Sequence, residues 1–177
     1  CIRDRARLAG KSLERFRAEA RAHLLAQVVE EVPEGIFVTD LEGRILYANR
    51  ALFAQTGYAP GEVLGQTPRL FKSGKHPPAF YQALWETLGR GQVFQAVFWN
   101  RRKDGQLLVE HKLLTPLRDP RGQVVAYAST GREITREYNL YRVQQVLLRH
   151  LDLFLRQGAG RGHLQGLLRE ALEAVPG

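Results

Sequence analysis

Residues 93–130, VFQAVFWNRRKDGQLLVEHKLLTPLRDPRGQVVAYAST, contain the pattern that decides the fold. Runs of β-branched, aromatic and other apolar residues are separated there by two short polar segments. One segment holds Asp104-Gly105 and the other Asp119-Pro120-Arg121-Gly122, and both favour tight turns because glycine supplies a positive φ angle. The stretch therefore predicts a meander of three antiparallel strands, at 93–101, 107–117 and 124–130.

Two more strands and three helices are predicted upstream of this meander. Apolar runs at 35–39 and 44–48 flank the turn at 40–43, which is typical of a hairpin. Helical spacing follows, and a loop rich in Gly, Pro and Lys at 65–78 interrupts it. The predicted fold class is α+β, with one five-stranded antiparallel sheet and short helices over one face. The predicted helices occupy 49–56, 60–64 and 79–88.

Amphipathic helices are predicted on both sides of this domain. Apolar residues recur every three or four positions from 11 to 31, and Pro33 ends that helix. Near the other end, Leu140, Leu147 and Phe154 are seven apart, and Leu151 lies four after Leu147, as in a heptad. A coiled-coil helix and a helix packed on its own domain both fit this spacing. Glycines at 158, 160 and 162 then precede a second short helical pattern.

The net charge of +8 lies mostly on the flanks. Residues 1–22 hold seven basic and three acidic residues, and residues 132–177 hold seven and five. The centre is nearly neutral, so we expect solvated helix faces and no nucleic-acid partner. No apolar run is long enough to span a bilayer, so we expect no membrane contact. One Cys and no Met among 177 residues exclude an internal disulfide and favour an excised part of a longer protein.

Four short motifs occur in an order that is typical of one family of sensor domains. They are Phe37-Val38-Thr39-Asp40 with Ile45–Asn49, Gly57-Tyr58 with Glu62–Gly65, Trp99–Gly105, and Glu133-Ile134-Thr135. Over residues 26–135 the chain thus resembles the PAS family. The resemblance implies a signalling helix at 1–25, the PAS domain at 26–135 and an outgoing helix at 136–157. Residues 158–177 would be a linker and the first helix of a GAF domain, which 167–177 resembles.

The resemblance extends to the flavin-binding LOV subgroup, but this chain lacks the reactive cysteine of that subgroup. Gly65–Lys72 aligns with the LOV loop that carries the photoactive cysteine, and Pro68 stands at the cysteine position. FMN–cysteinyl photochemistry is therefore excluded. Asn100 matches one flavin-contacting asparagine, but the other position holds Glu110 and the flavin-sensing glutamine position holds Gly131. A carboxylate beside the flavin ring would be repulsive, so we expect no FMN.

Haem, another cofactor of the family, is also disfavoured. It needs an axial ligand, usually a histidine on the pocket helix. His76 lies before the predicted helix at 79–88, next to two prolines, and we expect it to face solvent. No histidines pair at metal-ligand spacing, so no metal site is predicted, and the cofactor is unknown.

The family fold implies a pocket under the helices, although apolar side chains alone could fill it. Glu110 and Lys112 share one strand face with Leu108, because side chains alternate along a strand. If that face points inward, the carboxylate and ammonium pair with each other or with a polar ligand; if it points outward, they are surface charges. The candidate pocket residues are Phe53, Leu70, Phe71, Phe80, Leu84, Phe98, Asn100, Leu108, Glu110 and Lys112.

The resemblance implies a cytoplasmic, homodimeric PAS sensory module of a multidomain, bacterial-type signalling protein. A small-molecule or redox signal would pass through Glu133, Ile134 and Thr135 to a downstream effector domain. The dimer helix would pair through Leu140, Leu147, Leu151 and Phe154. No catalytic motif is present, so this fragment is not expected to be an enzyme. The alternatives are a ligand-free dimerisation scaffold, and the sensor part of a histidine kinase or cyclic-dinucleotide enzyme.

Overall fold

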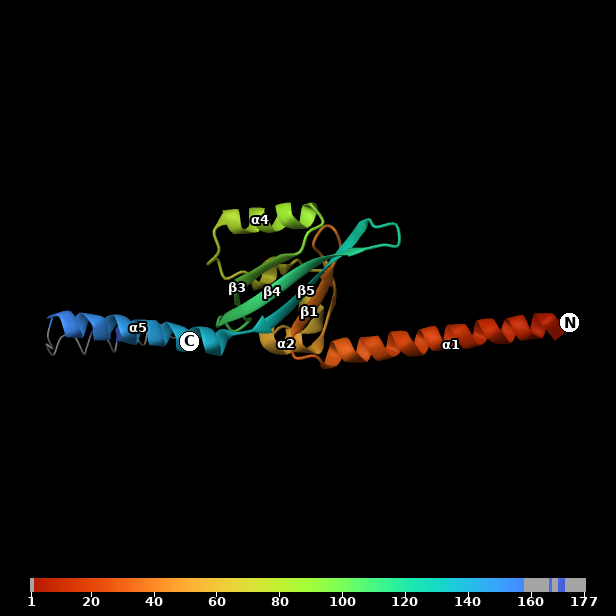
Figure 1. The fold of residues 1–177 in the computed structure, drawn as a ribbon, viewed down its shortest axis with the longest axis horizontal. Helices are drawn as coiled ribbons and strands as arrows, with labels where there is room; N and C mark the ends of the chain where they lie inside the picture. Colours follow the sequence, from red (N-terminus) through yellow and green to blue (C-terminus); the bar gives the residue numbers. More distant parts are fainter. Residues whose placement is uncertain (1, 158–165, 167–168, 171–177) are drawn as a thin grey trace.

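A five-stranded antiparallel sheet forms the centre of the molecule and confirms the predicted fold class (Figure 1). The computed structural model describes residues 2–157, 166, 169 and 170, so the predicted GAF segment lies almost wholly outside the described residues. The strand order is β2-β1-β5-β4-β3. The strands are β1 (Gly35–Thr39), β2 (Ile45–Ala48), β3 (Phe94–Arg101), β4 (Leu107–Arg118) and β5 (Val124–Glu133).

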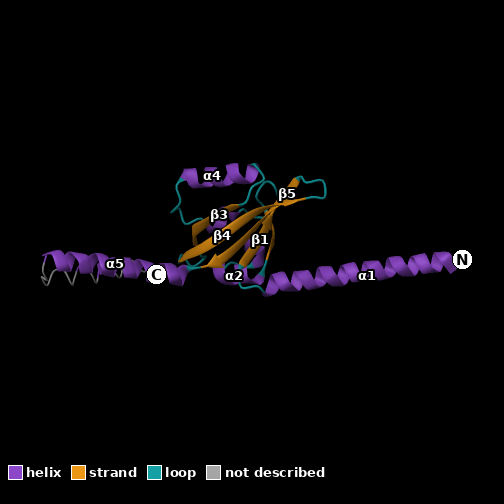
Figure 2. Ribbon diagram, in the orientation of Figure 1, coloured by secondary structure: helices purple, strands orange, loops and turns teal. Residues whose placement is uncertain are grey.

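Short helices between β2 and β3 cover one face of the sheet (Figure 2). Two buried clusters lie between the layers, one around Phe37 and Leu52 and the other around Leu84 and Phe98. The segment predicted as a loop at 65–78 contains a 3-10 turn that begins at Pro68, since proline is favoured at the first helical position. The helices are α2 (Arg50–Thr56), α3 (Pro60–Val63), η1 (Pro68–Phe71) and α4 (Pro78–Gly89).

Two long helices extend from opposite sides of this core, α1 (Ile2–Glu31) and α5 (Thr135–Gln157) (Figure 1). Asn49 joins α1 to the core. Its fully buried side chain accepts hydrogen bonds from the Ile36 and Leu52 amides and donates to the carbonyls of Val29 and Glu34. One residue therefore caps α2 and holds the end of α1 against β1.

A second contact between α1 and the sheet lies beside Asn49. The Tyr47 hydroxyl donates a hydrogen bond of 2.5 Å to the Glu30 carboxylate. Burial, together with this hydrogen bond, raises the pKa of Tyr47 to about 12. The same bond is the main cause that lowers the pKa of Glu30. None of the described helices is long and apolar enough to cross a bilayer.

The register of β4 decides which of its side chains point inward. Phe98 of β3 and Glu133 of β5 lie directly opposite Glu110, and Gly131 lies opposite Lys112. Directly paired residues share a face of the sheet, so Glu110 and Lys112 lie on the covered face with Phe98. Their exposed fractions are 1% and 3%, and the alternative of two surface charges is excluded.

Candidate functional site

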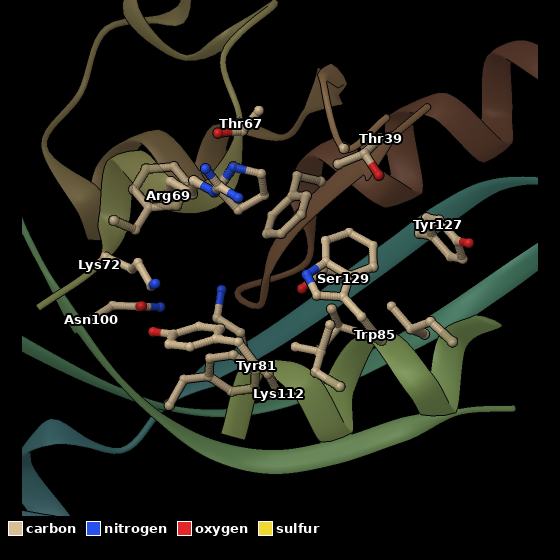
Figure 3. Close-up of a pocket in the computed structure, with 18 of the residues that line it drawn as sticks. Thr39, Thr67, Arg69, Lys72, Tyr81, Trp85, Asn100, Lys112, Tyr127 and Ser129 are labelled. Carbon is tan, nitrogen blue, oxygen red and sulfur yellow. The ribbon is translucent and has the colours of Figure 1, made fainter. Parts of the chain in front are cut away.

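A cavity of about 400 Å³ lies between the covered face of the sheet, η1 and α4 (Figure 3). Its volume falls in the range of small-molecule sites. Aromatic rings form much of its wall, and flat walls of this kind suit a planar ligand. The aromatic lining residues are Phe37, Phe71, Tyr81, Trp85, Phe98 and Tyr127.

Basic side chains give the cavity a positive balance. Arg69, Lys72 and Lys112 line it, whereas Glu42 is the acidic member of the lining set. The Lys72 ammonium lies 3.8 Å from the centroid of the Tyr81 ring, in a cation–π contact. This balance favours a ligand that carries negative charge.

A buried ion pair lies at the floor of the cavity, which only its lysine lines. The Lys112 ammonium lies 3.1 Å from Glu110 Oε1. The Asn100 amide donates a hydrogen bond of 2.7 Å to Glu110 Oε2. Lys112 itself lines the cavity, while Glu110 lies outside the lining set. The carboxylate is thus held from two sides, as a buried charge requires.

Gly131 provides the room for this ion pair. A Cβ atom at position 131 would lie 2.7 Å from Glu110 Oε1 and 3.3 Å from Lys112 Cγ. A larger residue would have to displace the pair, because contacts under 3.0 Å are not tolerated. The space of a side chain at 131 is therefore taken by Glu110 and Lys112.

Ser129 of β5 presents an unused polar group to the same cavity. Its side chain is 1% exposed, and its hydroxyl has no hydrogen-bond partner among the described residues. Buried hydroxyls are usually paired, so an unpaired one inside a cavity marks a contact point for a ligand or water.

The structure brings only part of the predicted pocket set to the cavity. Phe71, Leu84, Phe98, Asn100 and Lys112 line it. Phe53 and Leu70 pack against the cluster around Leu52, and Phe80 packs against the cluster around Phe98. Leu108 and Glu110 are fully buried outside the lining set.

Sequence reasoning missed several residues of the cavity. Arg69 and Lys72 stand in the segment predicted as a loop, and Tyr81 and Trp85 lie on α4. Tyr127, Ser129 and Gly131 occupy every second position of β5 and therefore share one face of the strand. This spacing indicates in the sequence that the three residues lie on one face, but only the register of β5 against β4 shows that this face points into the cavity.

The expectation that His76 faces solvent is wrong. The imidazole is 8% exposed and stacks on Phe80, with ring centroids 3.8 Å apart. Its Nε2 atom accepts a hydrogen bond of 2.9 Å from the Trp99 amide, and burial lowers its pKa. The lone pair that a haem iron would use is therefore engaged. The described residues contain no group of three His, Cys, Asp or Glu side chains that could hold a metal.

The junction between β5 and α5, named here the exit junction, consists of Glu133, Ile134 and Thr135. The Arg102 guanidinium bridges the Gln55 carbonyl and the Glu133 carboxylate. The Ile134 amide donates to the Val109 carbonyl over 2.8 Å, and the Val109 amide donates to Thr135 Oγ1 over 3.0 Å. The start of α5 is thus bonded to Val109 of β4, one residue from Glu110 and three from Lys112.

The predicted dimer positions lie on α5 and face away from the core. Leu140, Leu147 and Leu151 are 63%, 46% and 53% exposed. The side chain of Phe154 lies outside the described residues.

The family model described as the PAS fold matches residues 23–134. The nitrogen fixation regulatory protein of Klebsiella oxytoca is 35% identical over 130 residues, which are 73% of this chain and 26% of that protein. The bacterioopsin transcriptional activator of Halobacterium salinarum is 26% identical over 160 residues, 89% of this chain and 23% of the relative. The chain thus spans about a quarter of the length of these relatives.

A solved light-oxygen-voltage domain, studied with a flavin analogue, has the same fold. It superposes with a TM-score of 0.59 at 26% identity, over 68% of this chain and 92% of that one.

Breaking the buried ion pair from one side should destabilise the protein. The Lys112→Met variant leaves an uncompensated carboxylate in the core, so we expect its unfolding free energy to fall by about 3–5 kcal/mol. The double variant Glu110→Gln, Lys112→Met buries no charge and should recover most of that loss. Urea denaturation followed by circular dichroism measures both.

Lys103→Met is the matched control, because Lys103 pairs with Glu62 over 2.7 Å in a half-exposed ion pair. We expect its stability to stay close to that of the wild type. Equal losses in the single and double Lys112 variants would show that packing, and not charge pairing, governs this site.

The buried state of His76 should make stability depend on pH. Its pKa in the folded protein lies below the ordinary value of about 6.5. The unfolded chain therefore binds the proton more readily than the folded protein does. The contribution of His76 to stability is fully present above about pH 6.5 and is lost as the pH falls through the folded pKa. The rings around His76 belong to Phe80, Tyr81, Phe98 and Trp99, and none carries a charge in this range.

The His76→Gln variant tests this assignment, because glutamine can accept the Trp99 hydrogen bond and does not titrate. We expect the loss of unfolding free energy between about pH 7 and about pH 5 to be smaller in the variant. An unchanged pH dependence in His76→Gln would exclude His76 as its source.

Proposed function

We propose that this chain, which belongs to the PAS family, is the sensory module of a multidomain signalling protein and binds a planar, negatively charged ligand in its cavity. The observation that carries the proposal is the cavity of about 400 Å³, with aromatic walls, the basic residues Arg69 and Lys72, and an unpaired buried hydroxyl. Both relatives named above are regulators by their names. A cytoplasmic location remains our prediction.

A flavin nucleotide is the ligand class that fits best. Its ring system is flat and aromatic, and its phosphate is anionic, so it matches the ring-lined wall and the basic residues. Trp85 and Tyr81 of α4 would lie against the ring, and Arg69 and Lys72 would hold the phosphate. The light-oxygen-voltage domain of the same fold was studied with a flavin analogue, which supports this class.

The argument against flavin from Glu110 loses its force in the structure. The carboxylate is paired with Lys112 and Asn100, and it lies outside the cavity lining. The ammonium offsets the charge that would repel the ring. Pro68 lines the cavity at the position of the photoactive cysteine, so we propose a flavin that acts through occupancy or oxidation state and forms no cysteinyl adduct.

The exit junction supports a route from the cavity to α5. Lys112 of β4 and Asn100 of β3 line the cavity. The same strand β4 carries Val109, whose backbone bonds to Ile134 and Thr135. A shift of β4 would change the hydrogen bonds that start α5. We propose that α5 relays this change to an effector domain of the parent protein.

The freshly purified protein tests the ligand. We expect mass spectrometry or an absorption spectrum to reveal a bound flavin, and the apoprotein to bind added FMN more tightly than riboflavin, which lacks the phosphate. The variant Arg69→Gln, Lys72→Gln should bind the two probes equally, because only the phosphate contacts are lost. Ligand-free preparations that bind neither probe would favour the dimerisation scaffold.

We further propose that the chain forms a homodimer through its helices. The apolar stripe of Leu140, Leu147 and Leu151 is exposed in the single chain, and its heptad spacing suits a second copy. The upstream helix also exposes Phe16 and Leu24.

Light scattering on a version of the chain that ends at Thr135 tests the contribution of α5. We expect the full chain to be a dimer. The shortened chain should already dissociate at a higher protein concentration, because it lacks the Leu140–Leu151 stripe and its dimer is weaker. A dimer of unchanged affinity would refute pairing through α5.

A further inference from the structure

We propose that Lys112 and Ser129 form a recognition edge for an electron-rich oxygen of the bound heterocycle, and that Glu110 couples this edge to the exit junction. The inference rests on the proposed function, because it names how the same cavity reads its ligand. It assigns a role to the ion pair of Glu110 with Lys112, whose carboxylate stands at a position where the resemblance implies an asparagine.

The Lys112 ammonium has hydrogen-bonding capacity that the protein leaves unused. Within the described residues the ammonium lies 3.1 Å from Glu110 Oε1 and 5.1 Å from the centroid of the Phe37 ring, so a single acceptor oxygen faces it. Glu110 Oε1 accepts no hydrogen bond of good geometry there. An ammonium has three donors, and burial without acceptors is costly. A ligand oxygen inside the cavity would satisfy Lys112.

Ser129 places a second unused donor on the same floor. Its strand position lies two residues from Gly131, the cross-strand neighbour of Lys112, and its hydroxyl lacks a partner among the described residues. Figure 3 shows both side chains at the cavity. The remaining donors of the ammonium and the unpaired hydroxyl match a carbonyl or enolate oxygen on the edge of a heteroaromatic ring.

Glu110 connects this edge to the start of α5. It lies directly across from Glu133 in the β4–β5 pair, and each carboxylate has its own cation: Lys112 for Glu110 and Arg102 for Glu133. When a ligand oxygen draws Lys112 away, the charge of Glu110 is less well balanced and acts on its neighbours. Arg102 is the nearby cation that could respond, and it holds the exit junction to α2 through the Gln55 carbonyl.

Riboflavin is the probe for the recognition edge, because it has the ring but no phosphate. We expect the folded double variant Glu110→Gln, Lys112→Met to bind riboflavin about tenfold more weakly than the wild type, as the loss of a charged hydrogen bond predicts. Ser129→Ala should weaken binding in the same direction. Lys103→Met, which removes a lysine from an ion pair outside the cavity, should bind as the wild type does.

Hydrogen exchange tests the coupling. In the wild-type chain, saturating riboflavin should change the exchange of peptides that cover residues 133–137, whereas the double variant at its own saturating concentration should show no change there. Equal responses would overturn the coupling through Glu110.

The two proposals fail in different ways. A wild-type chain that binds neither FMN nor riboflavin overturns the proposed ligand class, and the recognition edge with it. A wild-type chain that binds riboflavin, beside a double variant of equal affinity, overturns the recognition edge alone and leaves the proposed function intact.

Discussion

The buried pair of Glu110 and Lys112 is the constraint on which the centre of the domain depends. Charges taken out of water must be paired and hydrogen-bonded, since an isolated one costs several kcal/mol, on the order of the whole stability of a small domain. The surrounding residues meet part of this requirement: Asn100 donates to one carboxylate oxygen, and Gly131 leaves the space that the pair fills. The pair thus has contacts with residues of all three strands, β3, β4 and β5.

The strand that carries this pair, β4, also contacts both the cavity and the exit junction. β4 carries Lys112 at the cavity and Val109 at the junction, three residues apart. Alternation along the strand sends Lys112 inward, while the backbone of Val109 remains free to bond Ile134 and Thr135. We therefore propose that β4 links ligand binding in the cavity to the start of the outgoing helix.

Local patterns were sufficient for most of the fold. Turn residues such as Asp104-Gly105 and the alternating runs around them predicted the strands, because these signals act over a few residues. The site was predicted less completely. Phe98, Asn100 and Lys112 stood out by residue type, whereas Arg69 and Lys72 were hidden in an apparent loop, and Ser129 resembled any serine in a strand. His76 was misplaced because stacking partners such as Phe80 come together only in the folded chain.

The sequence by itself determined the order of strands and helices along the chain. It also determined the heptad-like stripe of α5 and the absence of a cysteine at position 68. These properties depend on residue type and short-range spacing. Only the tertiary structure decided that Glu110 and Lys112 point inward. It also placed them where a side chain at position 131 would lie, and it turned Ser129 toward the cavity. The reason is that a shift of one residue in the pairing of β4 with β5 exchanges the two faces of the strand, and the partners that set this register lie far apart in the chain.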